Sequence, residues 1–336
     1  MIVVRAPLRI SFAGGGTDLP DFYRYYPGRV ISTTIDKYVY VAINRTPLIP
    51  YISARYRISE TVDTPHKLQH TRIKAALIDL GIKKGLEIAS FADLPAKTGL
   101  GSSSSFTVAL LKGLHAFLGK KLHTYEVAEL ACRLEIELVN EPIGKQDQYA
   151  ASFGGFNIFE FNKQGKTQVK PLLIDYKNRL NFEDHLLVCY TGLTREASSV
   201  LKEQKKNINN KIRILKKMSD SVYQFSELLL NGKLKDLGEM LHQGWTSKKS
   251  LANTISNPII DYLYETGISN GAWGGKILGA GGGGCLLFIT PIEKKTRIYH
   301  ALKTKAKGLK LTEFKQIPIR FVQSGAEILF NADHHQ

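Results

Sequence analysis

Residues 95–105, PAKTGLGSSSS, constrain this sequence more than any other stretch. Two glycines, Gly99 and Gly101, flank a leucine; four serines follow, and apolar residues then recur at helical spacing from Phe106 to Phe117. A glycine-hinged loop that leads into a helix leaves several backbone N–H groups without partners. Together with the positive end of the helix dipole, these groups form a site for an anion of phosphate size. The sequence therefore predicts a phosphate-binding loop here.

Charge and length limit the possible partners. The chain has 336 residues, enough for two domains or one large one, and a formal net charge of +16, which favours an anionic partner without naming it. Lysines gather at 202–217 and 303–310. Apolar residues at helical spacing between the lysines of the first group indicate a solvated helix face, and no RNA-binding motif or zinc finger accompanies it. We therefore expect no nucleic-acid partner.

Apolar runs and cysteines in the sequence indicate where in the cell the protein acts. No apolar run is long enough to span a bilayer, and Arg5 and Arg9 interrupt the N-terminal stretch too early for a signal peptide. Cys132, Cys189 and Cys285 are far apart, with no C-x-x-C pair and no His/Cys cluster. We expect buried free thiols in a cytoplasmic protein with no membrane partner.

Two further glycine-rich segments stand near the ends of the chain. Gly14, Gly15 and Gly16 turn between predicted strands at 2–12 and 30–43, and Asp18 just after them would either bind ligand hydroxyls or cap the turn. Near the other end, residues 281–284 are four consecutive glycines directly before a buried strand. Ordering them costs backbone entropy, so we expect either a ligand or another loop to lie against this backbone.

One glutamate stands out in the helix predicted for 125–140. Glu126, Glu129 and Glu137 fall on its polar arc, whereas Glu135 falls in the middle of the apolar arc. A buried carboxylate needs a cation or a donor network. Its partner is either an arginine or a divalent metal, which phosphate sites commonly need. In the loop that follows, Asp147 is either a general base or the cap of the next turn.

At this point the sequence resembles the GHMP kinases, the family of galactokinase, homoserine kinase, mevalonate kinase and phosphomevalonate kinase. The family's central motif, a proline, a short spacer, then G-L-G-S-S and a small residue, matches 95–104, and its two other motifs resemble residues 6–18 and 278–284. Galactokinases have a glycine in place of Leu8 and a glutamate and histidine after the first glycine. Residues 6–18, 143–149 and 191–195 look instead like the branch of D-glycero-D-manno-heptose 7-phosphate kinases, with the kinase half of bifunctional fucokinases as a close relative.

The resemblance implies a fold and a division of the chain. The fold is α+β in two domains: a ribosomal protein S5 domain 2-like N-terminal domain that binds ATP, and a ferredoxin-like C-terminal domain. We expect the first at residues 1–180, the second at 181–330 and a tail at 331–336, with ATP in the cleft between the domains.

The resemblance also implies roles for residues. Asp147 would take or orient the proton of the attacking hydroxyl, and Arg9 would steady Asp147 and the developing charge. Ser103, with Ser102 as the alternative, would hold Mg²⁺ together with Glu135. ATP phosphates would lie on Pro95, Lys97, Thr98, Gly99, Leu100, Gly101, Ser102, Ser103 and Ser104. The sugar would lie on Gly15, Gly16, Thr17, Asp18, Lys145, Arg195, Gly281 and Gly282. Lys145 and Arg195 are our two predictions for the group that binds the sugar's own phosphate.

The expected activity is ATP- and Mg²⁺-dependent phosphorylation of the anomeric hydroxyl of D-glycero-D-manno-heptose 7-phosphate to the 1,7-bisphosphate, which feeds nucleotide-activated heptose synthesis. Fucose or another sugar is the alternative acceptor. A sugar- and ATP-binding regulator without turnover is the alternative of another class, and a basic nucleic-acid-binding protein is a third; the intact Ser103, Glu135 and Asp147 favour an enzyme. The sequence leaves the oligomeric state open.

Overall fold

The computed structural model describes residues 1–194, 200–203 and 208–332. Two long strands, β1 (Ile2–Ala13) and β2 (Gly28–Arg45), pair antiparallel and form the centre of a first sheet with the order β13-β1-β2-β5-β3-β4. β12 and β6 also pair with β2, and β7 pairs with β6. The other strands of this sheet are β3 (Ile52–Arg55), β4 (Ser59–Val62), β5 (Leu86–Ala92), β6 (Phe156–Phe161), β7 (Thr167–Pro171), β12 (Phe321–Val322) and β13 (Glu327–Asn331).

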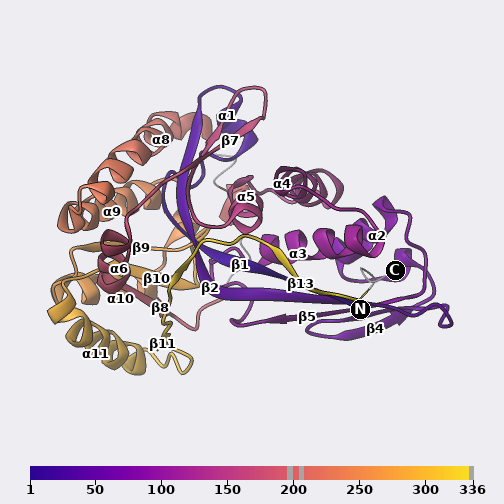
Figure 1. Cartoon of the computed structure of the whole chain (residues 1–336). Coiled ribbons are helices and arrows are strands. Elements are labelled where there is room, and N and C mark those ends of the chain that lie inside the picture. Colours follow the sequence, from indigo (N-terminus) through magenta and orange to yellow (C-terminus); the bar gives the residue numbers. More distant parts are fainter. Residues whose placement is uncertain (195–199, 204–207, 333–336) are drawn as a thin grey trace.

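Helices of the N-terminal half cover one side of this sheet (Figure 1). The central one, α3 (Ser102–Phe117), packs on β1 and β2, and α8 (Ile208–Leu230) of the C-terminal half also contacts both strands. Every residue from Ala6 to Phe12 is therefore buried, as in strands covered on both faces. The remaining elements here are α1 (Pro20–Tyr23), a 3₁₀ turn at Pro65–Lys67, α2 (Thr71–Asp79), α4 (Thr124–Cys132), η2 (Arg133–Leu138) and α5 (Gln146–Phe153).

The helix expected at 125–140 changes character halfway. It begins as α4 and continues from Arg133 to Leu138 as η2, a π-helical segment. Such wide turns are rare and occur frequently at functional sites. Here the segment carries Glu135, whose side chain is fully buried against α3, whereas Glu137 is exposed as periodicity predicted.

A second, four-stranded antiparallel sheet has the order β11-β8-β10-β9 (Figure 1). Its strands are β8 (Leu186–Tyr190), β9 (Gly274–Ile277), β10 (Cys285–Ile289) and β11 (Lys315–Gln316). Its helices are α6 (Tyr176–His185), α8 (Ile208–Leu230), α9 (Leu234–Lys249), α10 (Pro258–Ser269) and α11 (Ile292–Gly308), with a 3₁₀ turn at Asn253–Ile255. Strand, helices, two strands, helix and strand follow each other from β8 to β11, which is the ferredoxin-like order. The expected α+β fold is confirmed.

The predicted boundary needs one correction. Residues 181–330 do not form one contiguous unit, because β12 pairs with β2 and β13 pairs with β1 of the first sheet. The expected tail at 331–336 begins inside β13, which ends at Asn331. Strand pairing of this kind depends on long-range packing rather than on local preference, so the sequence pattern did not reveal where these short strands return.

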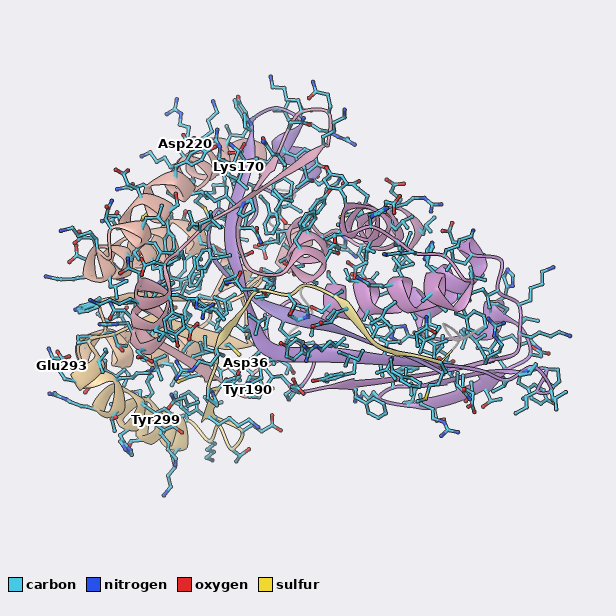
Figure 2. All side chains as sticks on the ribbon, viewed as in Figure 1. Asp36, Lys170, Tyr190, Asp220, Glu293 and Tyr299 are labelled. Carbon is cyan, nitrogen blue, oxygen red and sulfur yellow. The ribbon has the colours of Figure 1, made fainter. Side chains whose placement is uncertain are left out.

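Both halves share one core, which holds the walls of any site between them in place. The Phe12 ring of β1 lies 5.3 Å from those of Phe182 in α6 and Phe225 in α8. Polar contacts reinforce the junction: the backbone N–H of Asp36 donates to Arg320 O (2.8 Å), and Arg29 Nη1 donates to Asp220 Oδ1 (3.0 Å). Figure 2 labels Asp36 and Asp220 along this junction.

Candidate active site

A cleft of about 900 Å³ lies where the first sheet meets the C-terminal half. All three glycine-rich loops line it, through Gly15 and Gly16, Gly99 and Gly101, and Gly279 and Gly281. Its volume is in the range of small-molecule sites. Segments far apart in the sequence therefore meet at one cavity, as the three motifs require.

The N-terminus of α3 opens into this cleft. Gly101 precedes the helix with φ 79°, a left-handed conformation that favours glycine, and Ser102, Ser103 and Ser104 of the first turn line the cavity together with Lys97. Backbone N–H groups in a first helical turn have no partner within the helix. The geometry of an anion site is thus present where residues 95–105 predicted it.

Three residues of the predicted phosphate loop do not line the cleft. Thr98 and Leu100 are fully buried, and Pro95 is exposed outside the cavity. Thr98 supports the loop instead, since its carbonyl accepts a hydrogen bond from the backbone N–H of Cys285 (2.9 Å). The motif contains these residues because the loop needs them for its shape.

The C-terminal glycine run packs directly behind the phosphate loop. A Cβ atom added to Gly99 would lie 2.4 Å from Leu278 O, and one added to Gly284 would lie 2.5 Å from Thr98 O. Of the two explanations for these glycines, contact with another loop accounts for Gly284. Gly281 lines the cleft as expected, whereas Gly282 is buried, with its N–H donating to Ile255 O (2.8 Å), so its prediction as a sugar contact is not supported.

Arg9 and Asp147 form a bidentate ion pair on the floor of the cleft. Arg9 Nε and Nη2 donate to the two Asp147 carboxylate oxygens at 2.8 and 2.7 Å, and Arg9 Nη1 donates to Gly99 O at 2.6 Å. The Arg9 side chain is 4 % exposed and that of Asp147 24 %. Two residues separated by most of the N-terminal half are therefore brought together, and Arg9 ties the phosphate loop to an accessible carboxylate.

Asp18 lies beside this pair. Its carboxylate accepts hydrogen bonds from the N–H groups of Gly16 (3.0 Å) and Gln146 (3.3 Å). Burial, followed by the negative charge of Asp147, raises the pKa of Asp18. Thr17 needs a correction: it is fully buried, its hydroxyl lies 2.8 Å from the carbonyls of Gly14 and Arg29, and it shapes the turn rather than facing the cleft.

Glu135 has an arginine partner. Oε1 accepts from Arg72 Nε and Thr107 Oγ1 (2.8 Å each), and Oε2 accepts from Ser104 Oγ (2.8 Å) and Gln148 Nε2 (2.6 Å). A carboxylate offers about four acceptor positions, and all are used. Within the described ranges, no three His, Cys, Asp or Glu side chains gather as a metal site.

The expected metal pair, Ser103 and Glu135, is therefore not supported by this geometry. Ser103 lines the cleft, but the serine hydroxyl that reaches Glu135 belongs to Ser104. Glu135 as placed does not fit Mg²⁺, because a metal would have to displace one of its donors. Helical periodicity predicted that the Glu135 side chain faces the interior, but it left open whether its partner is an arginine or a metal.

The structure does not support Lys145 as the group that binds the sugar's own phosphate. Lys145 Nζ donates to Gly165 O (2.8 Å), lies 3.5 Å from Glu129 Oε2, and does not line the cleft. Arg195 lies outside the described residues. The basic side chains that do line the cleft, besides Arg9, are Arg57, Arg72, Lys97, Lys202, Lys248 and Lys276.

Two of these lysines are buried and were not predicted. Lys248 Nζ donates to Gly279 O, and burial followed by the charge of Arg9 lowers the pKa of Lys248 to about 8. Lys276 Nζ donates to Ser11 O and Phe12 O (2.9 Å each), and burial followed by the charge of Lys248 lowers its pKa well below the usual value. The signal was present: Lys248 continues the apolar helical spacing of Leu241 and Trp245, as Glu135 does in its own helix.

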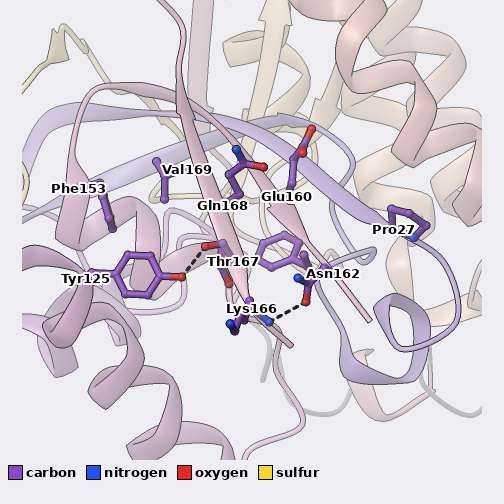
Figure 3. Close-up of a pocket in the computed structure, with 10 residues that line it drawn as sticks. Pro27, Tyr125, Phe153, Glu160, Asn162, Lys166, Thr167, Gln168 and Val169 are labelled. Atoms are coloured by element: carbon purple, nitrogen blue, oxygen red, sulfur yellow. Dashed lines mark hydrogen bonds between the residues drawn. The ribbon is translucent and has the colours of Figure 1, made fainter. Parts of the chain in front are cut away.

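A second cavity, of about 510 Å³, lies between α4, α5 and the β6–β7 hairpin (Figure 3). Figure 3 shows Tyr125 pointing to Thr167, whose carbonyl accepts its hydroxyl hydrogen bond. None of the predicted site residues lines this cavity. The cleft beside α3 is therefore the candidate active site.

Comparison with known proteins identifies the class. The GHMP kinases N terminal domain matches residues 69–155, which contain the phosphate loop and Asp147, and the GHMP kinases C terminal domain matches residues 225–308. The chain belongs to the GHMP kinase family. Members of this family use ATP, and this protein is a sugar kinase, a phosphotransferase with an alcohol group as acceptor.

Individual relatives span nearly the whole chain. D-glycero-alpha-D-manno-heptose 7-phosphate kinase of Campylobacter jejuni is 30 % identical over 90 % of this chain and 93 % of its own length. L-fucokinase/L-fucose-1-P guanylyltransferase of Bacteroides fragilis is 26 % identical over 85 % of this chain and 34 % of its own. The crystal structure of a D-glycero-D-manno-heptose 1-phosphate kinase from Bacteroides thetaiotaomicron has a TM-score of 0.81 at 25 % identity, with 98 % of this chain and 99 % of that chain covered. Among the described helices, none is both long and apolar enough to cross a membrane.

Proposed function

We propose that this protein is an ATP-dependent kinase that phosphorylates the anomeric hydroxyl of D-glycero-D-manno-heptose 7-phosphate, giving the 1,7-bisphosphate for nucleotide-activated heptose synthesis in the cytoplasm. The observation that carries the proposal is the Arg9–Asp147 pair beside the N-terminus of α3. In this proposal the Asp147 carboxylate receives the acceptor hydroxyl, and the neighbouring N-terminus of α3 binds the donor phosphates.

The chemistry follows from this juxtaposition. The acceptor oxygen forms a bond to the terminal phosphorus of ATP, the bond from that phosphorus to ADP breaks, and the hydroxyl proton passes to Asp147 and then to solvent. Phosphoryl transfer requires positioning and charge stabilisation more than covalent catalysis. The Arg9 guanidinium can serve both positioning and charge stabilisation, since it carries a positive charge and donates hydrogen bonds to both Asp147 and the Gly99 carbonyl. A carboxylate held by two N–H donors orients the hydroxyl in a fixed direction.

Mg²⁺ enters this proposal as part of the nucleotide substrate. Ser103, at the mouth of the phosphate loop, is the hydroxyl that we expect closest to MgATP. Glu135, whose acceptor positions are filled, instead accepts a hydrogen bond from Ser104, which lies next to Ser103 in the first turn of α3, and so anchors that turn. No step of the proposed reaction depends on a metal bound to Glu135.

The acceptor is proposed from similarity and charge. A relative whose name gives a heptose 7-phosphate as its substrate is 30 % identical over nearly the full length. The cleft carries several basic side chains, which suit an acceptor with its own phosphate. Relatives named as fucokinases support an unphosphorylated sugar as the second possibility.

A substrate panel tests class and acceptor together. ADP release would be measured with ATP, Mg²⁺ and either heptose 7-phosphate, the unphosphorylated heptose, L-fucose or D-galactose, and phosphorus NMR would locate the new phosphate. We expect turnover with heptose 7-phosphate and a new signal on C1. D147N, which keeps the size of the side chain, is the control that should lose turnover.

Other outcomes decide against the proposal. Turnover with L-fucose alone would establish a fucokinase. Binding of ATP and sugar without turnover on any acceptor would establish the non-catalytic regulator. Phosphate on a carbon other than C1 would leave the kinase class standing and overturn the anomeric assignment.

A further inference from the structure

Two consecutive lysines at the end of α9 lie in opposite environments. Lys248 is 6 % exposed and lines the cleft. Lys249 does not line it, and its Nζ lies 3.2 Å from Asp261 Oδ1. Lysines in the last turn of a helix ordinarily serve the helix dipole. That explanation suffices for Lys249, whereas the burial of Lys248 needs another.

The ammonium of Lys248 is held next to the phosphate loop. Its Nζ donates to Gly279 O, and a Cβ added to Gly279 would lie 2.7 Å from Gly99 Cα. Gly99 is also the residue whose carbonyl accepts from Arg9 Nη1. Lys248 therefore reaches, from the C-terminal half, the point at which Arg9 joins the loop to Asp147.

The Lys248 ammonium can donate more hydrogen bonds than it makes to the described residues. An ammonium has three N–H donors, and the Gly279 carbonyl is the one acceptor that it contacts among the described residues. A buried charge without an ion-pair partner is costly. Burial at this cost is expected where the charge has a task in the bound state, such as contact with an anion in the cleft.

The charges around Lys248 point to a reacting phosphate. Arg9 and Lys276 are its positive neighbours, and Asp18 and Asp147 are the negative ones. Besides burial, Arg9 lowers the pKa of both lysines, and Lys248 lowers that of Lys276, so these basic groups repel one another and favour an anion beside them. In the proposed reaction Asp147 meets the attacking hydroxyl and the Gly99 loop meets the ATP phosphates, so the transferred phosphoryl group would pass close to Lys248.

We propose that Lys248 binds the phosphoryl group that is transferred, so that α9 contacts it opposite the N-terminus of α3. This rests on the proposed kinase function and adds a residue of the C-terminal half to the catalytic group. Lys276, the other buried lysine that lines the cleft, donates instead to Ser11 O and Phe12 O and is not part of the proposed contact.

A binding experiment with K248M, and K249M as the matched control, tests the proposal. Calorimetry would measure the affinities of AMP-PNP and ADP with Mg²⁺, since these ligands differ in the terminal phosphate. A charged hydrogen bond corresponds to about a 10- to 100-fold change in affinity. We expect K248M to lose about that factor for AMP-PNP with ADP affinity unchanged, and K249M to change neither. The melting temperature of K248M should equal or exceed that of the wild type, because methionine removes a buried charge.

Three outcomes would count against it, each in a different way. Equal loss of AMP-PNP and ADP, or no loss of either, would overturn the contact with the terminal phosphate. A loss of heptose 7-phosphate affinity in the presence of ADP, with AMP-PNP affinity kept, would assign Lys248 to the acceptor's phosphate instead. Failure of the wild type to bind either nucleotide would overturn the proposed function itself.

The pH dependence of the unmodified protein gives a second test that needs no variant. Lys248 is protonated below its pKa of about 8, and an anion bound to it raises that pKa. AMP-PNP affinity should therefore be level below pH 8 and fall as the pH rises above it. K249M should show the same fall and K248M should lack it; a fall of the same size in K248M would overturn the contact.

Discussion

Two arginine–carboxylate pairs lie on either side of the α3 N-terminus, and they differ in what they leave open. Arg72 and Glu135 are joined at 2.8 Å, and three more donors fill a carboxylate that is 0 % exposed. Arg9 and Asp147 are joined through both oxygens at 2.8 and 2.7 Å, and the Asp147 side chain is 24 % exposed. We call Arg72–Glu135 the closed pair, because all acceptor positions of its carboxylate are filled. We call Arg9–Asp147 the open pair, because its carboxylate is accessible from the cleft.

The difference separates structural from chemical roles. The closed pair ties η2, α2 and α3 together, and Arg72 also binds Glu141 at 2.7 Å. A buried ion pair with this many partners is destabilising to break. The open pair keeps one carboxylate face toward the cleft, where a substrate hydroxyl can approach. Variants of the first pair should therefore chiefly change stability, and variants of the second should chiefly change turnover.

The largest expected effect is on the closed pair. E135A should lower the free energy of unfolding by about 3–5 kcal/mol, because Ser104, Thr107 and Gln148 lose their buried acceptor and Arg72 loses one of its two carboxylate partners. Urea denaturation measures it, and E137A, at an exposed position of the same segment, should stay within about 0.5 kcal/mol of the wild type. A stable E135A that instead requires more Mg²⁺ for turnover would restore Glu135 as a metal ligand.

The next effect is on the open pair. D147N should reduce kcat by about 10²- to 10⁴-fold, the usual contribution of a positioned acid–base group. Because it also neutralises the partner of the buried Arg9, kcat is compared at a temperature at which the variant is folded. Asp79 offers a matched control, since Arg133 holds it in a bidentate pair at 2.9 and 2.7 Å on the surface. D79N should keep wild-type kcat. Equal losses in both variants would remove the distinction between the two sites.

Geometry within the open pair is tested by R9K. Lysine keeps the charge but cannot hold both Asp147 oxygens and Gly99 O in a fixed plane. We expect kcat/KM to fall by about tenfold or more, the equivalent of one charged hydrogen bond. R133K should leave kcat/KM unchanged. Full activity of R9K would show that charge alone suffices.

The smallest effect is expected for Lys145. Because Lys145 Nζ is bound to Gly165 O away from the cleft, K145A should change the KM for a sugar phosphate by less than about twofold, and stability by about 1 kcal/mol or less. Steady-state kinetics with heptose 7-phosphate decides the matter. A tenfold rise in KM would return Lys145 to the acceptor's phosphate.

Much of the site could be predicted, and for identifiable reasons. The motif around Gly99 and Gly101 predicted an anion site, and the helix that follows begins at Ser102, where the loop ends. Motif position also selected Arg9 and Asp147, which the structure brings together. Adjacency to a motif was a poor guide for Lys145, because a neighbouring residue in a turn points elsewhere, and for Thr17, whose hydroxyl is used by the backbone.

The sequence by itself determined which side chains face inward, since helical spacing and glycine placement are local properties. It predicted that Glu135 is buried; the same spacing holds for Lys248, whose burial was not predicted. Only the tertiary structure decided their partners, Arg72 for one and the Gly279 carbonyl beside the cleft for the other. The same holds for β12 and β13, which return to the first sheet. Partners are chosen by packing between segments distant in the chain, and local spacing carries no information about it.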